Sequence, residues 1–142
     1  YPVVNVGRMV TKHVDIMFDV VREMLLAYGI ESAYEVEHPG LWVGTSKVAA
    51  VGVEIREGVS MHGFALNAHR VVNGFELIIP CGLSHRGTIY MSELAKVGPL
   101  ESLAEEFAER YSVARREALS WLAPDLFARK HHIEHLLRSP SA

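Results

Sequence analysis

The sequence KVAAVGVEIR, residues 47–56, decides the fold class of this chain. It is mostly apolar, which is typical of a strand that is largely buried in a sheet. Two more strand-like segments follow, SMHGFALNAHRV at residues 60–71 and GFELIIP at residues 74–80. Asn73-Gly74 lies between them and is a typical β-hairpin turn. The middle of the chain is therefore predicted to form consecutive strands of one sheet.

The segment before these strands is predicted to be a helix followed by two short strands. In residues 11–29, TKHVDIMFDVVREMLLAYG, apolar residues recur at helical spacing, with Thr11 as the N-cap and Gly29 as the residue that ends the helix. AYEVEH at residues 33–38 and GLWVG at residues 40–44 are candidate strands, joined by a turn at Pro39-Gly40. The residues expected on the buried helix face are Val14, Met17, Phe18, Val21, Leu25 and Tyr28.

The last part of the chain returns to a helical pattern. One face is expected to hold Leu100, Leu103, Ala104, Phe107, Tyr111, Ala114 and Ala118. Pro124 ends that segment, and a short final helix is predicted over residues 125–137. A helix, then strands, then helices indicate a single α+β domain over residues 1–142, in which helices flank a mostly antiparallel or mixed sheet.

Composition narrows the class of protein. The 142 residues are 49% hydrophobic and 22% charged, which is sufficient for one soluble domain with its own core. A formal charge of −3 provides no broad basic surface, so we expect no nucleic-acid partner. The single cysteine excludes an intrachain disulfide and a cysteine zinc cluster. No apolar run reaches the length of a membrane span and no signal peptide opens the chain, so we expect a cytoplasmic protein that does not bind membranes.

Two short motifs suggest chemistry but are weak. HHIEH at residues 131–135 matches a zinc-peptidase pattern, with His131 and His135 on one helix face and Glu134 as a base. No Asp or Glu follows Glu134 to complete the metal site, so a solvated helix face is the better interpretation. GLWVGTSK lacks the spacing of a phosphate-binding loop. We therefore expect no metal.

Cys81 is the strongest candidate for chemistry. A lone cysteine is commonly a small buried residue, but Pro80 cannot continue a strand ladder and Gly82 permits a tight turn. The thiol is therefore predicted to lie at the end of a strand, where it could be an exposed nucleophile. A thiol nucleophile needs a partner that stabilises its thiolate, and Lys47 and His62 are candidates. The alternatives are that Lys47 is the solvated start of a strand and His62 a half-buried histidine.

Four sequence blocks together resemble one family. HPGLWVG, KVAAVG, HGFALN and PCG occur here in the order and at the spacing found in the octanoyl-[acyl-carrier-protein]:protein N-octanoyltransferases of lipoate biosynthesis. The resemblance covers residues 1–94 and implies the fold of the biotin and lipoate protein ligases, a mixed sheet flanked by helices. The family segment R-G-G-x-x-x-x-H-G-P-G-Q has no counterpart here. The resemblance thus implies the C-terminal two-thirds of the catalytic domain, without its N-terminal third.

The resemblance also implies roles for individual residues. Cys81 would be the nucleophile that carries the acyl group as a thioester, and Lys47 would stabilise the thiolate and act as general acid and base. Substrate-binding positions would be His62 and the acyl-site residues Ala50, Val51, Gly52, Gly63, Phe64 and Ala65. Glycine in such a site lets an acyl chain lie against the backbone.

The reaction implied is transfer of octanoate from acyl carrier protein to a lysine of lipoyl domains, in 2-oxoacid dehydrogenases and the glycine cleavage H protein. It requires no cofactor, neither ATP nor a metal. Two alternatives remain: an ATP-dependent lipoate ligase of the same fold, and a non-catalytic fragment that binds carrier protein. Glu54 and Glu57 depart from the family by occupying positions that are often basic, which affects docking of acidic partners.

Overall fold

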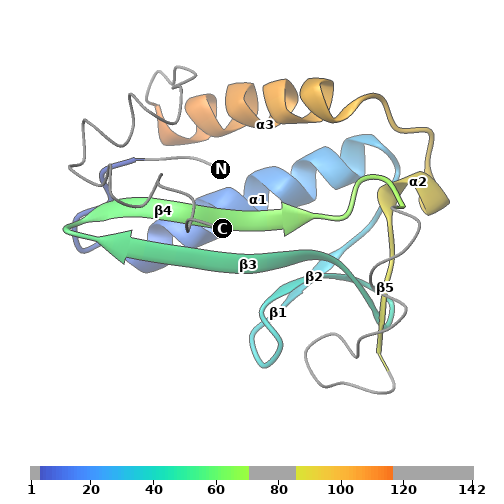
Figure 1. The fold of residues 1–142 in the computed structure, drawn as a ribbon, viewed down its shortest axis with the longest axis horizontal. Coiled ribbons are helices and arrows are strands. Elements are labelled where there is room, and N and C mark those ends of the chain that lie inside the picture. Colours follow the sequence, from blue (N-terminus) through green and yellow to red (C-terminus); the bar gives the residue numbers. More distant parts are fainter. Residues whose placement is uncertain (1–3, 71–85, 117–142) are drawn as a thin grey trace, which may run out of the picture.

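A computed structural model of the chain describes residues 4–70 and 86–116 (Figure 1). Within them, helices and strands follow in the order α1 (Val10–Ala27), β1 (Ala33–Glu35), β2 (Gly40–Val43), β3 (Ser46–Arg56), β4 (Val59–Leu66), β5 (Gly87–Thr88), α2 (Met91–Leu94) and α3 (Leu100–Arg115). The sheet order is β1-β2-β3-β4, all antiparallel, and β5 joins β3 in parallel. The prediction of an α+β fold with a mixed sheet flanked by helices is confirmed.

Helix α1 buries the face that its periodicity predicts. Met17, Phe18, Val21 and Leu25 are all buried, and Gly29, at φ +75°, follows the helix in the left-handed conformation that glycine adopts without strain. The predicted N-cap at Thr11 is wrong. Met9 is the N-cap, because the Met9 N–H donates to Val6 O and the His13 N–H to Met9 O, so the helix begins before Thr11.

Strand β3 is the centre of the sheet. One edge pairs with β2 from Ser46 to Ala50. The other edge pairs with β4 from Ala49 to Arg56 and with β5 at Ser46 and Lys47. Figure 1 shows β3 and β4 as a long antiparallel ribbon, with β5 beside the start of β3. Both edges of β3 are therefore paired around Lys47, which makes this the most constrained part of the strand.

Two strand predictions need correction. Residues 47–56 are predicted to be largely buried, but only Val48 and Ala49 are, because the rest of β3 extends with β4 beyond β2. The predicted strand over residues 60–71 ends at Leu66. It ends there because Asn67 leaves the β4 ladder and donates its N–H to Val48 O, while the Ala68 N–H donates to Leu66 O in a turn.

The core lies between the helices and one face of the sheet. Helices α1 and α3 pack against each other, and Figure 1 shows them on the same side of β3 and β4. On α3, Leu103 and Tyr111 are buried and Phe107 is half-buried, as predicted, whereas Leu100, Ala104 and Ala114 are exposed. No helix in the described residues is both long enough and apolar enough to cross a membrane.

Some predictions lie outside the described residues. They are the Asn73-Gly74 turn, the strand over residues 74–80, Cys81, Ala118, Pro124, the final helix and the HHIEH motif. Conversely, nothing in the sequence pattern indicates β5 or α2. Both are shorter than the windows in which periodicity can be recognised.

Candidate active site

A β-bulge lies directly beside Lys47. Leu41 of β2 pairs with Ala49 of β3, and the next β2 residue, Trp42, pairs with Lys47. Strand β3 thus advances by two residues while β2 advances by one, and Val48 is the extra residue. A bulge of this kind changes the face to which the following side chains point.

The bulge places Lys47 on the same face of the sheet as the predicted acyl site. Lys47 and Ala50 are three positions apart and would face opposite sides of a regular strand. Their β2 partners, however, are Trp42 and Gly40, which are two positions apart and share a face. Cross-strand partners lie on the same face, so Lys47 and Ala50 do too. Leu41 and Ala49 occupy the opposite face, in the core beneath the helices.

The six predicted acyl-site residues form three cross-strand pairs between β3 and β4. Ala50 pairs with Ala65, Val51 with Phe64, and Gly52 with Gly63. The sequence separates these residues by up to fifteen positions, and the hairpin brings them together. The alanine and glycine pairs share the face of Lys47. The side chains of Val51 and Phe64 pack on the core side instead, where the Phe64 ring lies 4.8 Å from that of Phe107.

The alanine and glycine pairs define a surface of small residues, which we call the small-residue strip: Ala50, Gly52, Gly63 and Ala65. Gly52 and Ala65 are exposed, and a Cβ atom added at Gly52 would meet no atom within 4 Å. An extended acyl chain can lie against such a surface because no large side chain occupies it. The geometry therefore fits the predicted acyl-binding role, which stays a prediction.

Three groups from β2 and the turn before it hold the Lys47 side chain. Its Nζ donates to Pro39 O at 3.2 Å and lies 4.8 Å from the centre of the Trp42 ring. Its stem passes over Gly40, where an added Cβ atom would collide with Ala49 O and approach Cδ and Cε of Lys47 to 3.2 Å. Gly40 is therefore required for the lysine to lie where it does. Lys47 is not simply the solvated start of a strand.

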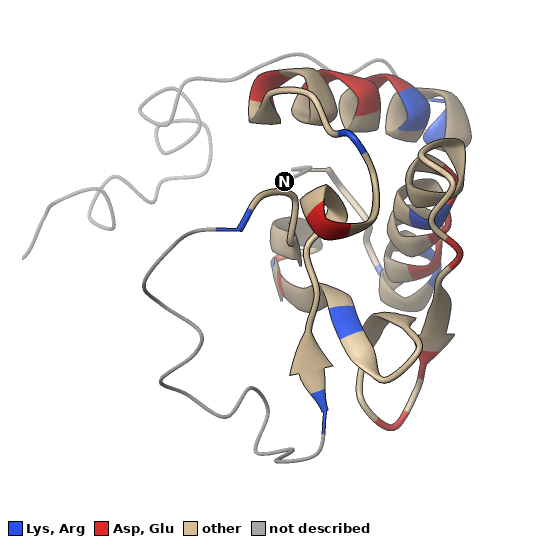
Figure 2. Ribbon diagram, turned by 90° about the vertical axis from the view of Figure 1, so that its right-hand side faces the viewer, with Lys and Arg blue, Asp and Glu red and all other residues tan. Residues whose placement is uncertain are grey.

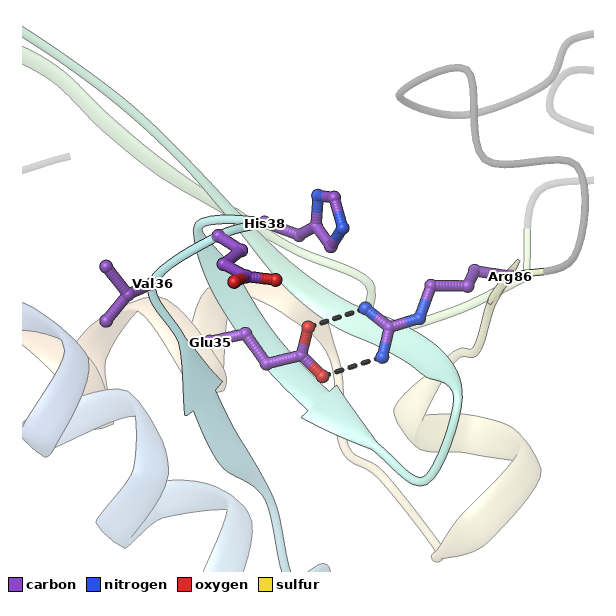
Figure 3. Close-up of a pocket in the computed structure, with 5 residues that line it drawn as sticks. Glu35, Val36, His38 and Arg86 are labelled. Atoms are coloured by element: carbon purple, nitrogen blue, oxygen red, sulfur yellow. Dashed lines mark hydrogen bonds and ion pairs between the residues drawn. The ribbon is translucent and has the colours of Figure 1, made fainter.

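A second cation, Arg86, also packs on Trp42. Its guanidinium carbon lies 4.0 Å from the ring centre, and both terminal nitrogens donate to the Glu35 carboxylate, at 2.5 and 2.7 Å. The hydrogen bond from Arg86 lowers the pKa of Glu35 and raises that of Arg86, so both groups stay charged. Figure 3 shows this pair joined by its two hydrogen bonds. Both residues line a cavity of about 490 Å³, together with Val36, Glu37 and His38.

Asn67 joins the elements around Lys47. Its side-chain amide donates to Lys47 O at 3.0 Å, and the Ile89 N–H donates to the same oxygen at 3.1 Å. The backbone carbonyl of Asn67 accepts a hydrogen bond from the Met91 N–H, at the start of α2. Trp42, Arg86, Glu35 and Asn67 were not among the predicted site residues. Trp42 and Asn67 belong to the HPGLWVG and HGFALN blocks, which is the signal that could have identified them.

The structure places His62 away from Lys47. His62 pairs with Val53, six positions along β3 from Lys47, which corresponds to about 20 Å of extended strand. Its ring is exposed and lies 3.5 Å from Glu54, which also binds Arg56. Its φ of +60° is unusual for a residue with a side chain. His62 thus lies far from Lys47, and strand alternation places it with Phe64 rather than with Gly63 and Ala65 of the small-residue strip. Its predicted contact with substrate stays a prediction.

Cys81 lies outside the described residues, so the predicted contact between Cys81 and Lys47 stays a prediction. The HHIEH motif also lies outside them. Within residues 4–70 and 86–116, no three His, Cys, Asp or Glu side chains gather in the way that a metal site requires.

The arrangement of helices and sheet defines the class of fold. Lipoate-protein ligase A bound with ATP superposes with a TM-score of 0.61 at 12% identity, over 87% of this chain and 54% of that one. The biotin protein ligase of Aquifex aeolicus gives a TM-score of 0.54 at 12% identity, over 87% of this chain and 52% of the ligase. The predicted fold of the biotin and lipoate protein ligases is therefore confirmed.

Sequence comparison identifies the family within that class. Residues 1–112 match the lipoyl protein ligase A/B catalytic domain. The octanoyltransferase of Alkaliphilus metalliredigens is 38% identical over 98 residues, 66% of this chain and 45% of that protein. The octanoyltransferase of Chloroflexus aggregans is 37% identical over 112 residues, 74% of this chain and 51% of that protein. The chain belongs to the lipoyl protein ligase A/B catalytic domain family, and it spans about half the length of these relatives.

Proposed function

We propose that this chain carries the reacting residues of an octanoyltransferase, which moves an octanoyl group from acyl carrier protein to a lysine of a lipoyl domain. The observation that carries the proposal is the bulge at Val48, which places Lys47 on the same face as the small-residue strip. The similarity to proteins named octanoyltransferase supports the same conclusion.

Cys81 is the proposed nucleophile, and the topology is compatible with this role. Thr88 pairs with Lys47 in the parallel β3–β5 ladder, and Cys81 precedes Thr88 by seven residues. Seven residues of extended chain span at most about 25 Å, so a contact between the Cys81 thiol and Lys47 is within the reach of the chain. The lysine and the cysteine, 34 positions apart in sequence, then act on the same acyl group.

The reaction proceeds in two acyl transfers. The Cys81 thiolate attacks the carbonyl carbon of the carrier-bound thioester, the carbon–sulfur bond to the carrier breaks, and the Lys47 ammonium protonates the departing thiolate. The acceptor lysine amine then attacks the Cys81 thioester, Lys47 takes the amine proton, and the Cys81 thiolate is released. The amide product forms at the expense of a thioester, so no nucleotide is consumed. The small-residue strip holds the octanoyl chain in both steps.

The test is intact-mass measurement of the protein after incubation with octanoyl carrier protein. One octanoyl adduct is expected, mapping to Cys81 after proteolysis. Cys81→Ser should form no adduct, because a serine hydroxyl ionises far less readily than a thiol. An adduct that persists in this variant, or that maps to another residue, would rule out the proposed nucleophile.

A matched experiment separates transferase from ligase. The same protein is incubated with octanoate, ATP and a lipoyl domain, and octanoylation of the lipoyl domain is followed by mass. A transferase modifies the lipoyl domain only from octanoyl carrier protein. Modification that requires ATP and free octanoate would identify a ligase instead, and no modification under either condition would identify a non-catalytic protein.

A further inference from the structure

A second cavity lies at the opposite end of the molecule from Lys47. It has a volume of about 410 Å³ and lies between the start of α1 and the end of α3. In Figure 1 these two helix ends are on the left, whereas β5, which pairs with Lys47, is on the right. The residues that line the cavity are Val6, Met9, Lys12, His13, Ile16, Ala114, Arg115 and Arg116.

His13 lines this cavity and has a buried ring nitrogen without a partner in the described residues. The residue is 1% exposed, and its Nδ1 lies 2.7 Å from the hydroxyl of Tyr111. Its Nε2 is buried and has no hydrogen-bond partner in the described structure. Burial, and to a smaller extent the charge of Arg115, lowers the pKa of His13, so the ring is neutral at pH 7. When the Tyr111 hydroxyl donates to Nδ1, Nε2 carries the ring hydrogen and is an unused donor.

The lining of the cavity is strongly basic. Lys12, Arg115 and Arg116 line it, and none of the lining residues in the described part of the chain is an aspartate or glutamate. Figure 2 shows the same asymmetry on α3, where acidic residues occur along most of the helix and basic residues toward its C-terminal end. Positive charge around a buried N–H group favours an anion over a cation or an apolar ligand.

The start of α1 adds to this positive potential. No side chain among residues 4–70 and 86–116 caps the helix, and its first turn contains no acidic residue. The first backbone N–H groups of a helix have no acceptor within the helix and carry a partial positive charge. Met9, Lys12 and His13, from the first turns of α1, line the cavity.

Helix stabilisation explains part of this arrangement but not all of it. Arg115 and Arg116 end α3, where cations stabilise the helix dipole. Arg115 also donates to Asn5 O at 3.4 Å and lies over the Tyr111 ring. Neither role accounts for Lys12, which is at the N-terminal end of a helix, where a cation is unfavourable. Neither role provides an acceptor for His13 Nε2.

We propose that this cavity binds a phosphate group, held by His13 Nε2–H and by the side chains of Lys12, Arg115 and Arg116. A phosphate dianion suits this set better than a carboxylate, because it offers more acceptor oxygens to the four donors that line the cavity. The volume also leaves room for part of a molecule that carries the phosphate. The site is separate from Lys47 and does not depend on the proposed transferase activity.

The test is a phosphate titration of the full chain, followed through the ¹⁵N resonances of the His13 ring. Inorganic phosphate and glycerol 3-phosphate are added at constant ionic strength, with chloride and acetate as matched additions. Before addition, Nε2 should be the protonated nitrogen. Saturable shifts at His13 with phosphate, but not with chloride or acetate, are expected. If glycerol 3-phosphate binds more tightly than inorganic phosphate, the ligand is a phosphate monoester. If it binds equally or more weakly, the ligand is the free phosphate ion.

Charge-removing variants test the site without disturbing the core. Lys12→Gln and Arg116→Asn should each weaken phosphate binding about tenfold, the loss of one charge-assisted hydrogen bond. Asparagine is chosen for position 116 because the residue is left-handed, at φ +56°. Lys96→Gln removes the same charge from an exposed position outside the cavity and should leave binding unchanged.

Three results would overturn the proposal. The first is an Nε2 that is unprotonated before phosphate is added. The second is a response to chloride or acetate equal to the response to phosphate. The third is a loss of binding in Lys96→Gln as large as in Lys12→Gln, which would indicate a general effect of net charge rather than a site.

Discussion

The two faces of the sheet differ in the kind of side chain they present. The face beneath α1 and α3 holds Leu41, Val48 and Ala49, all buried in the core. The other face holds the small-residue strip together with Lys47 and Trp42. The same two strands build both faces, so the direction of alternate side chains separates the residues of the core from those of the proposed site. Substitutions on one face should therefore affect folding, and those on the other should affect acyl transfer.

The largest effect is expected on the face that carries Lys47. Lys47→Arg keeps the positive charge, but arginine does not give up its proton, so the proposed general acid–base catalysis by Lys47 should be lost. We expect the rate of octanoyl transfer to fall about 10²- to 10⁴-fold, the usual contribution of a general acid or base. The rate is measured by octanoylation of a lipoyl domain. The midpoint of urea unfolding should not change, and wild-type turnover would make Lys47 an electrostatic neighbour only.

The core face should show the largest effect on stability. Leu41 is 1% exposed, and Leu41→Ala should lower the free energy of unfolding by about 2 to 5 kcal/mol. Urea denaturation followed by circular dichroism measures this loss. The control is Ala50→Ser, one cross-strand position away on the other face, which should change the free energy by less than about 1 kcal/mol. Equal losses in the two variants would contradict the separation of the faces.

Two glycines on the Lys47 face sharpen the comparison. At Gly40 a methyl group would collide with Ala49 O and press on the Lys47 stem, so Gly40→Ala should reduce transfer and cost about 1 to 3 kcal/mol of stability. At Gly52 the space is open, so Gly52→Ala should change stability by less than about 0.5 kcal/mol.

The same two variants distinguish the proposed role of Lys47 in the reaction from the proposed role of the small-residue strip in binding the acyl chain. Gly52→Ala should raise KM for octanoyl donors and shift preference toward shorter acyl chains, if the strip binds the chain. Gly40→Ala should lower kcat instead, because it displaces Lys47. Both are measured with donors of different chain length. An unchanged chain-length preference in Gly52→Ala would mean that the acyl group lies elsewhere.

The smallest effect is expected from the ion pair beside Trp42. Because Arg86 lowers the pKa of Glu35 below 4.5, this pair contributes stability above pH 4.5 that is lost as the pH falls through the folded-state pKa. Wild-type protein should be slightly more stable than Glu35→Gln at pH 7, and the difference should disappear as the pH falls below the folded-state pKa of Glu35. Thermal unfolding across this range measures it. A difference that grows as the pH falls would have the wrong sign.

Local patterns determined the elements that are long and periodic. The helix over Val10–Ala27 buries the residues that its spacing predicts, and the strands over Gly40–Val43, Ser46–Arg56 and Val59–Leu66 lie within or near their predicted ranges. In each of these elements the hydrophobic period can be recognised from the element's own residues, without knowledge of the rest of the chain. The family blocks likewise identify Lys47 and the residues of the small-residue strip by sequence alone.

Tertiary structure alone decided which of these residues share a face. A regular strand would place Lys47 opposite Ala50, and nothing in KVAAVG indicates that Val48 is an extra residue. The bulge lies where β2, β4 and β5 all pair with β3 within a few residues of Lys47. Likewise, Arg86 reaches Glu35 and Trp42, and His13 reaches Tyr111, only through contacts between distant segments. Sequence periodicity is a local property, whereas the face of a bulged residue and the partners of a buried side chain depend on how distant segments pair and pack.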